Sequence, residues 1–160
     1  IIETYKDIAT QKAANKAVIV YESVWKHTQQ IAESLAEGFS DADMDVKVYQ
    51  LSDTKSSIVM REIMDAKVVC IGSGTYNNVM APSVAAFLEH IRPCKFKNKK
   101  GLAFAAYGWF NQVAKEIDTR MQQSGIESCH DVINQCYTPS DDQLEDYFNV
   151  AKEIAKKCQE

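Results

Sequence analysis

The chain has 160 residues, of which 46% are hydrophobic and 25% charged, and its formal net charge is −4. This length supports one domain with a core on both faces of a sheet, and the acidic balance without a basic stripe excludes nucleic acid as a partner. The five scattered cysteines and three distant histidines match neither a disulfide framework nor a metal site.

Two further expectations follow from composition. No apolar run approaches the roughly 20 residues that a membrane helix needs, so no membrane partner is expected. An odd number of cysteines without a C-x-x-C motif fits reduced thiols, which predicts a cytoplasmic protein with no metal of its own.

Apolar runs rich in β-branched residues alternate with helical patterns along the chain. They predict strands over residues 17–22, 46–51, 67–73, 101–107 and 126–137, the last long enough to be interrupted. They predict helices over residues 27–38, 56–65, 82–92, 111–123 and 140–158. Residues 1–16 are expected to be a lead-in helix or linker from an upstream domain, and residues 17–160 the domain proper.

Several residues mark the predicted helix ends. Gly38 and Gly125 stand where left-handed C-caps are expected. Pro82 occupies a first helical turn. Ser140 with Gln143 forms a capping-box pattern at the start of the last helix.

The strands at 67–73 and 101–107 are apolar without polar alternation, which is typical of parallel strands covered by helices on both faces. Five strand–helix units therefore predict an α/β fold, a doubly wound, five-stranded parallel sheet in three α/β/α layers. Right-handed crossovers favour the strand order 2-1-3-4-5.

Ligands bind such sheets beyond the carboxyl ends of the strands, where the strand order reverses. The first loop at this point is called the phosphate loop below and comprises Ser23, Val24, Trp25, Lys26, His27 and Thr28. It precedes a helix, whose N-terminal amides and dipole favour a phosphate group. The alternatives are that Ser23 and Thr28 only cap the helix, and that His27 is a helix-start residue rather than a catalyst.

The two other loops at this point combine aromatic residues, glycines and amides. Their candidate residues are Ser73, Gly74, Thr75, Tyr76, Asn77 and Asn78 in the second loop, and Ala106, Tyr107, Gly108, Trp109, Phe110 and Asn111 in the third. Aromatic rings stack on a flat ring system, so a phosphate site beside them predicts FMN rather than ATP. The loops at 52–57 and 137–141 are expected to carry only turn and capping residues.

Over nearly its whole length the chain resembles the FMN-binding, flavodoxin-like domain of the A-type flavoproteins, also called flavodiiron proteins. The most specific matches are Tyr-Gly-Trp at residues 107–109 and Gly-Ser-x-Thr-Tyr-Asn at residues 72–77. The resemblance implies that residues 23–28 bind the phosphate of FMN, and that residues 75–78 and 107–111 flank its isoalloxazine ring.

In that family the domain follows a metallo-β-lactamase-like domain whose two irons reduce oxygen or nitric oxide. FMN passes electrons to those irons, usually across a head-to-tail dimer. The resemblance therefore implies an electron-transfer domain without a complete active site of its own. It also implies rubredoxin or a flavin/NADH reductase as electron donor, and a homodimer or higher homo-oligomer as the parent protein.

Three positions depart from the family pattern. Gly74 stands where proline is usual, Ala105 and Ala106 replace Gly-Ser, and Phe110 with Asn111 replaces a small residue followed by glycine. Three other functions remain open on the sequence. They are a stand-alone flavodoxin, a flavodoxin-like NAD(P)H quinone reductase, and a domain that has lost its flavin and serves only in dimer contacts.

Overall fold

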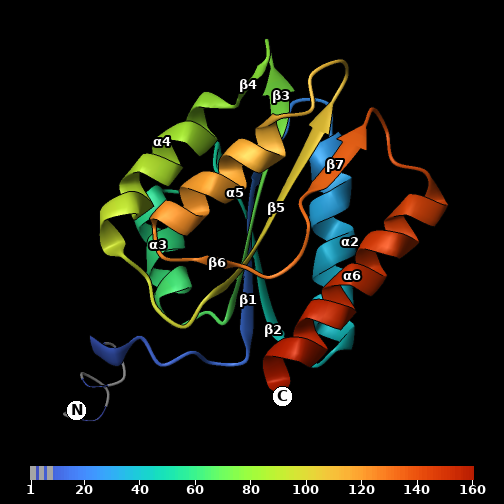
Figure 1. The fold of residues 1–160 in the computed structure, drawn as a ribbon. Helices are drawn as coiled ribbons and strands as arrows, with labels where there is room; N and C mark the ends of the chain where they lie inside the picture. The colour runs from blue at the N-terminus through green and yellow to red at the C-terminus, as the bar shows by residue number, and fades with distance from the viewer. Residues whose placement is uncertain (1–2, 4–5, 7–8) are drawn as a thin grey trace.

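The computed structural model describes residues 3, 6 and 9–160. Of the expected lead-in helix, the described residues Glu3, Lys6, Ala9 and Thr10 are helical, and residues 1–2, 4–5 and 7–8 lie outside the described part. A parallel sheet follows, with helices on both faces, in the three layers that the sequence predicts (Figure 1).

The sheet consists of β1 (Lys16–Glu22), β2 (Asp45–Gln50), β3 (Val68–Tyr76), β4 (Val79–Met80), β5 (Lys100–Tyr107), β6 (Glu127–Ser128) and β7 (Ile133–Cys136). Its path runs β2-β1-β3-β5-β6, with β7 also paired to β5 and β4 paired antiparallel to β3. The fifth predicted strand is thus interrupted and forms β6 and β7. With that division, the predicted order 2-1-3-4-5 is confirmed.

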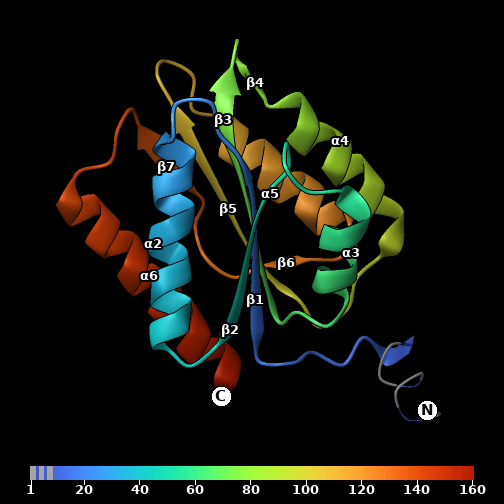
Figure 2. The ribbon, with the colours of Figure 1, turned by 180° about the vertical axis from the view of Figure 1, so that it is seen from behind.

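The helices form two outer layers. One face is covered by α3 (Ser56–Met64), α4 (Pro82–Ile91) and α5 (Val113–Gln123), and a short 3-10 turn, η1 (Arg92–Cys94), follows α4. The other face is covered by α2 (His27–Asp41) and α6 (Asp141–Gln159), as Figure 2 shows from behind.

Strand β1 shows why the central strands are apolar throughout. Val18 and Val20 pack into the core under α3, α4 and α5, whereas Ile19 packs into the core under α2 and α6. All seven residues of the strand are buried. A parallel strand with helices on both sides has no solvent face, so the polar alternation disappears.

Gly38 does not end the first helix, contrary to the prediction, because α2 continues to Asp41. The reason for the glycine is the contact between α2 and α6. A Cβ at Gly38 would lie 2.3 Å from the carbonyl oxygen of Phe148 and 2.7 Å from the Cβ of Ala151. Glycine therefore allows the two helices to pack closely.

The other end signals are confirmed. Gly125 follows α5 with a φ of 92°, the left-handed conformation of a glycine beyond a helix end. Ser140 accepts a hydrogen bond from the Gln143 amide, and the Gln143 side chain accepts one from the Ser140 amide. This capping box begins α6.

Two lysines hold the end of the sheet where the parallel strands begin. Lys16 Nζ pairs with Glu62 Oε2 at 2.6 Å and Asp65 Oδ1 at 2.9 Å, joining β1 to α3. Lys99, which is 2% exposed, donates from Nζ to the carbonyl oxygens of Met64 and Ala66 at 2.9 Å each. Burial lowers the pKa of Lys99 to about 8.

Candidate functional site

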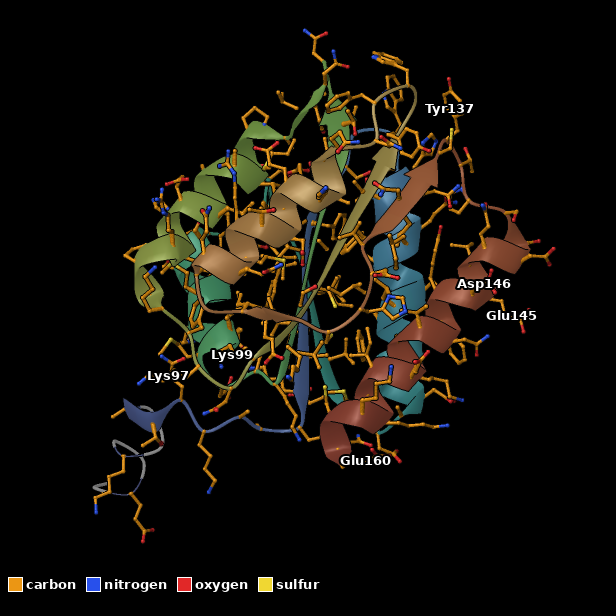
Figure 3. All side chains as sticks on the ribbon, viewed as in Figure 1. Lys97, Lys99, Tyr137, Glu145, Asp146 and Glu160 are labelled. Carbon is orange, nitrogen blue, oxygen red and sulfur yellow. The ribbon has the colours of Figure 1, made fainter. Side chains whose placement is uncertain are left out.

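A cavity of about 370 Å³ opens at the carboxyl ends of β1, β3 and β5. It lies at the switch point of the sheet. The chain passes from β1 to its neighbour β2 on one side and then crosses over to β3 on the other side of β1. Figure 3 shows that Tyr137, which lines this cavity, and Lys99 lie at opposite ends of the molecule.

Most of the predicted site residues line this cavity. They are Ser23, Val24, Trp25, His27 and Thr28 of the phosphate loop, Gly74, Thr75 and Tyr76 of the second loop, and Ala106, Tyr107, Gly108 and Trp109 of the third. The three loops, up to 86 residues apart in the chain, therefore meet at one place, as the switch-point argument predicts.

The phosphate loop leads into the N-terminus of α2. Lys26 is the N-cap residue and has a φ of 64°, and no side chain among the described residues accepts a hydrogen bond from the first turn of the helix. The capping alternative for Ser23 and Thr28 is therefore wrong. The first-turn amides of α2 remain available to an anionic group.

Thr28 is the most informative residue of this loop. Its side chain is 1% exposed and lines the cavity. Within the described part of the chain its hydroxyl has no hydrogen-bond partner, and its oxygen is not among the fully enclosed polar atoms, so it opens onto the cavity. Such an unpaired group facing a cavity is expected where a polar ligand supplies the partner.

His27 connects the phosphate loop to the last loop of the sheet. It is the first residue of α2, and its Nε2 lies 3.1 Å from Oγ1 of Thr138. The contact joins the start of α2 to the segment between β7 and α6. This agrees with the expectation that His27 begins the helix.

Glu22 is a buried residue of the site that the sequence argument did not single out. It is the last residue of β1 and is 8% exposed. Its Oε1 accepts hydrogen bonds from the Ser23 amide at 3.1 Å and from Gln50 Nε2 at 2.9 Å, and its Oε2 accepts one from Ser83 Oγ at 3.2 Å. The signal that could have found it is a charged residue ending an otherwise apolar strand.

The second loop continues β3 beyond the predicted end at residue 73. Strand β3 extends to Tyr76 and turns back as β4, with Asn77 and Asn78 between them at φ of 50° and 70°. A two-residue hairpin turn of type I′ needs positive φ at both central residues, which asparagine tolerates. The turn places Tyr76 on the wall of the cavity.

The second and third loops contact each other above the cavity. Trp109 Nε1 donates a hydrogen bond to Asn78 Oδ1 at 2.9 Å. Thr75 Oγ1 lies 3.5 Å from the carbonyl oxygen of Phe110. Burial and the negative charge of Glu22 raise the pKa of Tyr76, so this phenol stays neutral at physiological pH.

Tyr137 also lines the cavity, which the sequence did not predict. It follows β7, has a φ of 56°, and donates its amide hydrogen to the carbonyl oxygen of Tyr107 at 2.8 Å. A Cβ at Gly108 would lie 3.4 Å from its ring. The expectation that residues 137–141 carry only turn and capping residues is therefore wrong.

The remaining predicted site residues lie beside the cavity rather than on its wall. They are Lys26, Ser73, Asn77, Asn78, Phe110 and Asn111. Ser73 is fully buried and its hydroxyl accepts from the Ala81 amide at 2.8 Å, so it fixes the start of α4. Phe110 packs against the core under α4 and α5.

Two further properties of the described residues bear on function. In the described part of the chain, no three His, Cys, Asp or Glu side chains lie where they could hold a metal ion. None of its helices has the length and hydropathy to cross a membrane.

The cavity is suited to a phosphorylated flat ring. Its lining combines the unpaired hydroxyl of Thr28 at the N-terminus of α2 with aromatic rings from four loops. Three tyrosines and two tryptophans, Tyr76, Tyr107, Tyr137, Trp25 and Trp109, line it. The residues present therefore fit FMN, with the phosphate at α2 and the ring among the aromatic side chains.

Comparison with known proteins agrees with this geometry. A family model described as flavodoxin matches residues 19–158. Rubredoxin-oxygen oxidoreductase of Megalodesulfovibrio gigas is 33% identical over 155 residues, which are 97% of this chain and 39% of that protein. Nitric oxide reductase of Moorella thermoacetica is 38% identical over 127 residues, which are 79% of this chain and 32% of that protein.

Solved structures show the same relationship. Rubredoxin oxygen:oxidoreductase from Desulfovibrio gigas superposes with a TM-score of 0.95 at 32% identity, over 99% of this chain and 39% of that one. A flavodoxin from the Archaea superposes with a TM-score of 0.82 at 26% identity, over 91% of this chain and 99% of that one. This chain spans less than half the length of the two oxidoreductases. The chain belongs to the flavodoxin family, and it is homologous to the FMN domains of flavodiiron proteins.

Proposed function

We propose that this chain binds one FMN in the cavity beyond β1, β3 and β5 and serves as the electron-transfer domain of a flavodiiron protein. The observation that carries the proposal is the unpaired hydroxyl that Thr28, a buried residue, presents to the cavity at the N-terminus of α2. A phosphate group supplies acceptors for this hydroxyl and for the free amides of the helix. Bound FMN supplies the capacity to take up and release electrons.

The aromatic side chains orient the ring and keep water from it. Tyr76, Tyr107 and Tyr137 come from three different loops and line one cavity. Each stacked or edge-to-face aromatic contact contributes about 0.5–1.5 kcal/mol beyond the buried area. In the described part of the chain one helix N-terminus opens onto the cavity, which favours a mononucleotide over FAD.

The names of two relatives support a proposal about the partners of the domain. Two are named rubredoxin-oxygen oxidoreductase and nitric oxide reductase, and this chain spans 39% and 32% of them. The proposal is that rubredoxin or a flavin/NADH reductase donates electrons and that a di-iron centre in another domain accepts them. The parent protein would be a cytoplasmic homo-oligomer in which residues 1–16 are a linker from an upstream domain.

A titration tests the cofactor assignment. Purified protein freed of flavin is titrated with FMN, FAD and riboflavin, and binding is followed by the change in flavin fluorescence. FMN is expected to bind most tightly, riboflavin more weakly because it lacks the phosphate, and FAD more weakly because it lacks a site for its adenosine. A protein that binds none of the three would contradict the cofactor assignment.

A second experiment tests the electron-transfer role. The FMN-loaded chain, reduced by an artificial donor, should reduce a one-electron dye and show no sustained turnover with nitric oxide. Sustained iron-free turnover at the rate of a full-length relative would contradict the proposal. NAD(P)H-dependent quinone reduction would instead identify a quinone reductase.

A further inference from the structure

Glu22 lies behind the phosphate loop, at the point where four segments meet. It ends β1, and its carboxylate accepts hydrogen bonds from the Ser23 amide, from Gln50 at the end of β2, and from Ser83 in the first turn of α4. A fourth donor, Ser52 Oγ in the loop before α3, lies 3.4 Å from Oε1.

Every partner of this carboxylate is neutral. Among the residues that the structure describes, no lysine, arginine or histidine forms an ion pair with Glu22. A buried charge without a cation is costly unless hydrogen bonds satisfy it. Here the Ser23 amide, Gln50 Nε2, Ser83 Oγ and the N-terminal end of α4 stabilise the charge, and Ser52 Oγ lies equally near Glu22 and Asp53.

The hydrogen bond to Ser23 fixes the first peptide of the phosphate loop. Because the Ser23 amide hydrogen points to Glu22 Oε1 at 3.1 Å, the orientation of the peptide between these two residues is set. That orientation also sets the direction of the Ser23 side chain, which lines the cavity. Gln50 and Ser83 hold the carboxylate itself, so the loop is tied to β2 and α4.

We propose that Glu22 is a positioning residue whose carboxylate holds the Ser23 end of the phosphate loop and so determines how tightly the domain binds the phosphate group of its flavin. The inference rests on the proposed FMN-binding function. It concerns the phosphate alone, because the hydrogen bonds of Glu22 are made to the phosphate loop, β2, the loop before α3 and α4, and none is made to the third loop.

Two substitutions separate the hydrogen bonds of Glu22 from its charge. In Glu22→Gln the amide oxygen can still accept from Ser23 and Gln50, and the amide nitrogen can donate to Ser83 Oγ because a hydroxyl also accepts. The charge is lost and the contacts remain. In Glu22→Ala both are lost.

The test compares FMN with riboflavin, which shares the ring and lacks the phosphate. Flavin-free wild type, Glu22→Ala and Glu22→Gln are titrated with each flavin, and the ratio of the two affinities is measured. Glu22→Ala should weaken FMN binding about tenfold or more with riboflavin affinity unchanged, since hydrogen bonds to a charged group are lost. Glu22→Gln should keep FMN affinity at or above that of wild type, because a negative charge near the phosphate is removed.

Glu37→Ala is the matched control, since it removes an exposed carboxylate from α2 more than two turns beyond the loop. It should leave the affinity ratio unchanged. Ser83→Ala is a milder variant for the case in which Glu22→Ala does not fold, and it should lower the same ratio about two- to fivefold.

The possible results are distinguishable. An unchanged FMN-to-riboflavin ratio in both Glu22→Ala and Ser83→Ala overturns the inference and leaves the proposed function intact. Equal losses for the two flavins also overturn it, because they indicate a general loss of structure. A wild-type protein that binds neither flavin overturns the proposed function and this inference together.

Discussion

The indole N–H of Trp109 donates a 2.9 Å hydrogen bond to Oδ1 of Asn78, and this bond joins the loop after β5 to the turn between β3 and β4. The Trp109 side chain is 80% exposed, so burial does little to fix its ring. The hydrogen bond therefore determines where this aromatic wall of the cavity lies.

Removing that bond should weaken flavin binding through the ring. Asn78→Gly is the informative variant, because glycine adopts the φ of 70° at this turn without strain and lacks the amide. We expect affinity for FMN and for riboflavin to fall by the same factor, about two- to fivefold. Trp109→Phe should do the same. Gln123→Ala, which removes an exposed amide at the far end of α5, serves as control, and wild-type affinity in both test variants would contradict this role.

Thr28→Val should change two properties in opposite directions. Valine keeps the branched shape of a side chain that is 1% exposed and removes only the unpaired hydroxyl. FMN binding should weaken by about 1 kcal/mol or more, whereas the flavin-free protein should be as stable as wild type or more stable. Flavin titration and urea unfolding measure the two. An FMN affinity equal to that of wild type would exclude the phosphate contact.

Gly38→Ala should destabilise the protein although alanine favours helix. The added Cβ would lie 2.3 Å from a backbone oxygen of α6, and backbone cannot give way as a flexible side chain can. We expect a loss of about 1–3 kcal/mol in the free energy of unfolding from overpacking. Ser40→Ala, at an exposed position on the same helix, is the control and should change stability by a few tenths of a kcal/mol. A stabilised Gly38→Ala variant would show that the helices are less closely packed.

Lys99 should make stability depend on pH in the alkaline range. Its pKa is about 8 in the folded protein and about 10.4 in an unfolded chain, so between these values the unfolded state binds more protons. The penalty of the buried charge is thus present below pH 8 and is relieved as pH rises to 10. Wild type should gain about 1–3 kcal/mol relative to Lys99→Met between pH 7 and pH 10, measured by urea unfolding. A difference that stays constant with pH would contradict the lowered pKa.

Much of the fold was accessible to sequence reasoning, because the apolar periodicity of each segment is local. The interrupted last strand, the capping box at Ser140 and the glycine beyond α5 were all predicted. Gly38 was interpreted wrongly because the reason for a glycine at this position is a contact with residues more than a hundred positions away. Phe148 and Ala151 require the missing Cβ, and nothing in the helix itself indicates this.

In the site, too, features set by local sequence could be predicted and features set by distant neighbours could not. The three loops at the switch point could be placed, because parallel strands end at one edge. Tyr137 was missed because its position depends on the pairing of β7 with β5, which brings Cys136 beside Tyr107. Glu22 was missed because its partners, Gln50 and Ser83, come from two other segments of the chain.

The interruption between β6 and β7 has a consequence for how this protein behaves at high concentration. Strand β6 pairs with Lys100 and Gly101, and β7 pairs with Phe104 to Tyr107, so the ladder along that side of β5 skips Leu102 and Ala103. An edge made of a two-residue strand and a four-residue strand offers no long row of free amides and carbonyls. A strand from a second molecule therefore finds no continuous template there, which protects this edge of the sheet against edge-to-edge aggregation.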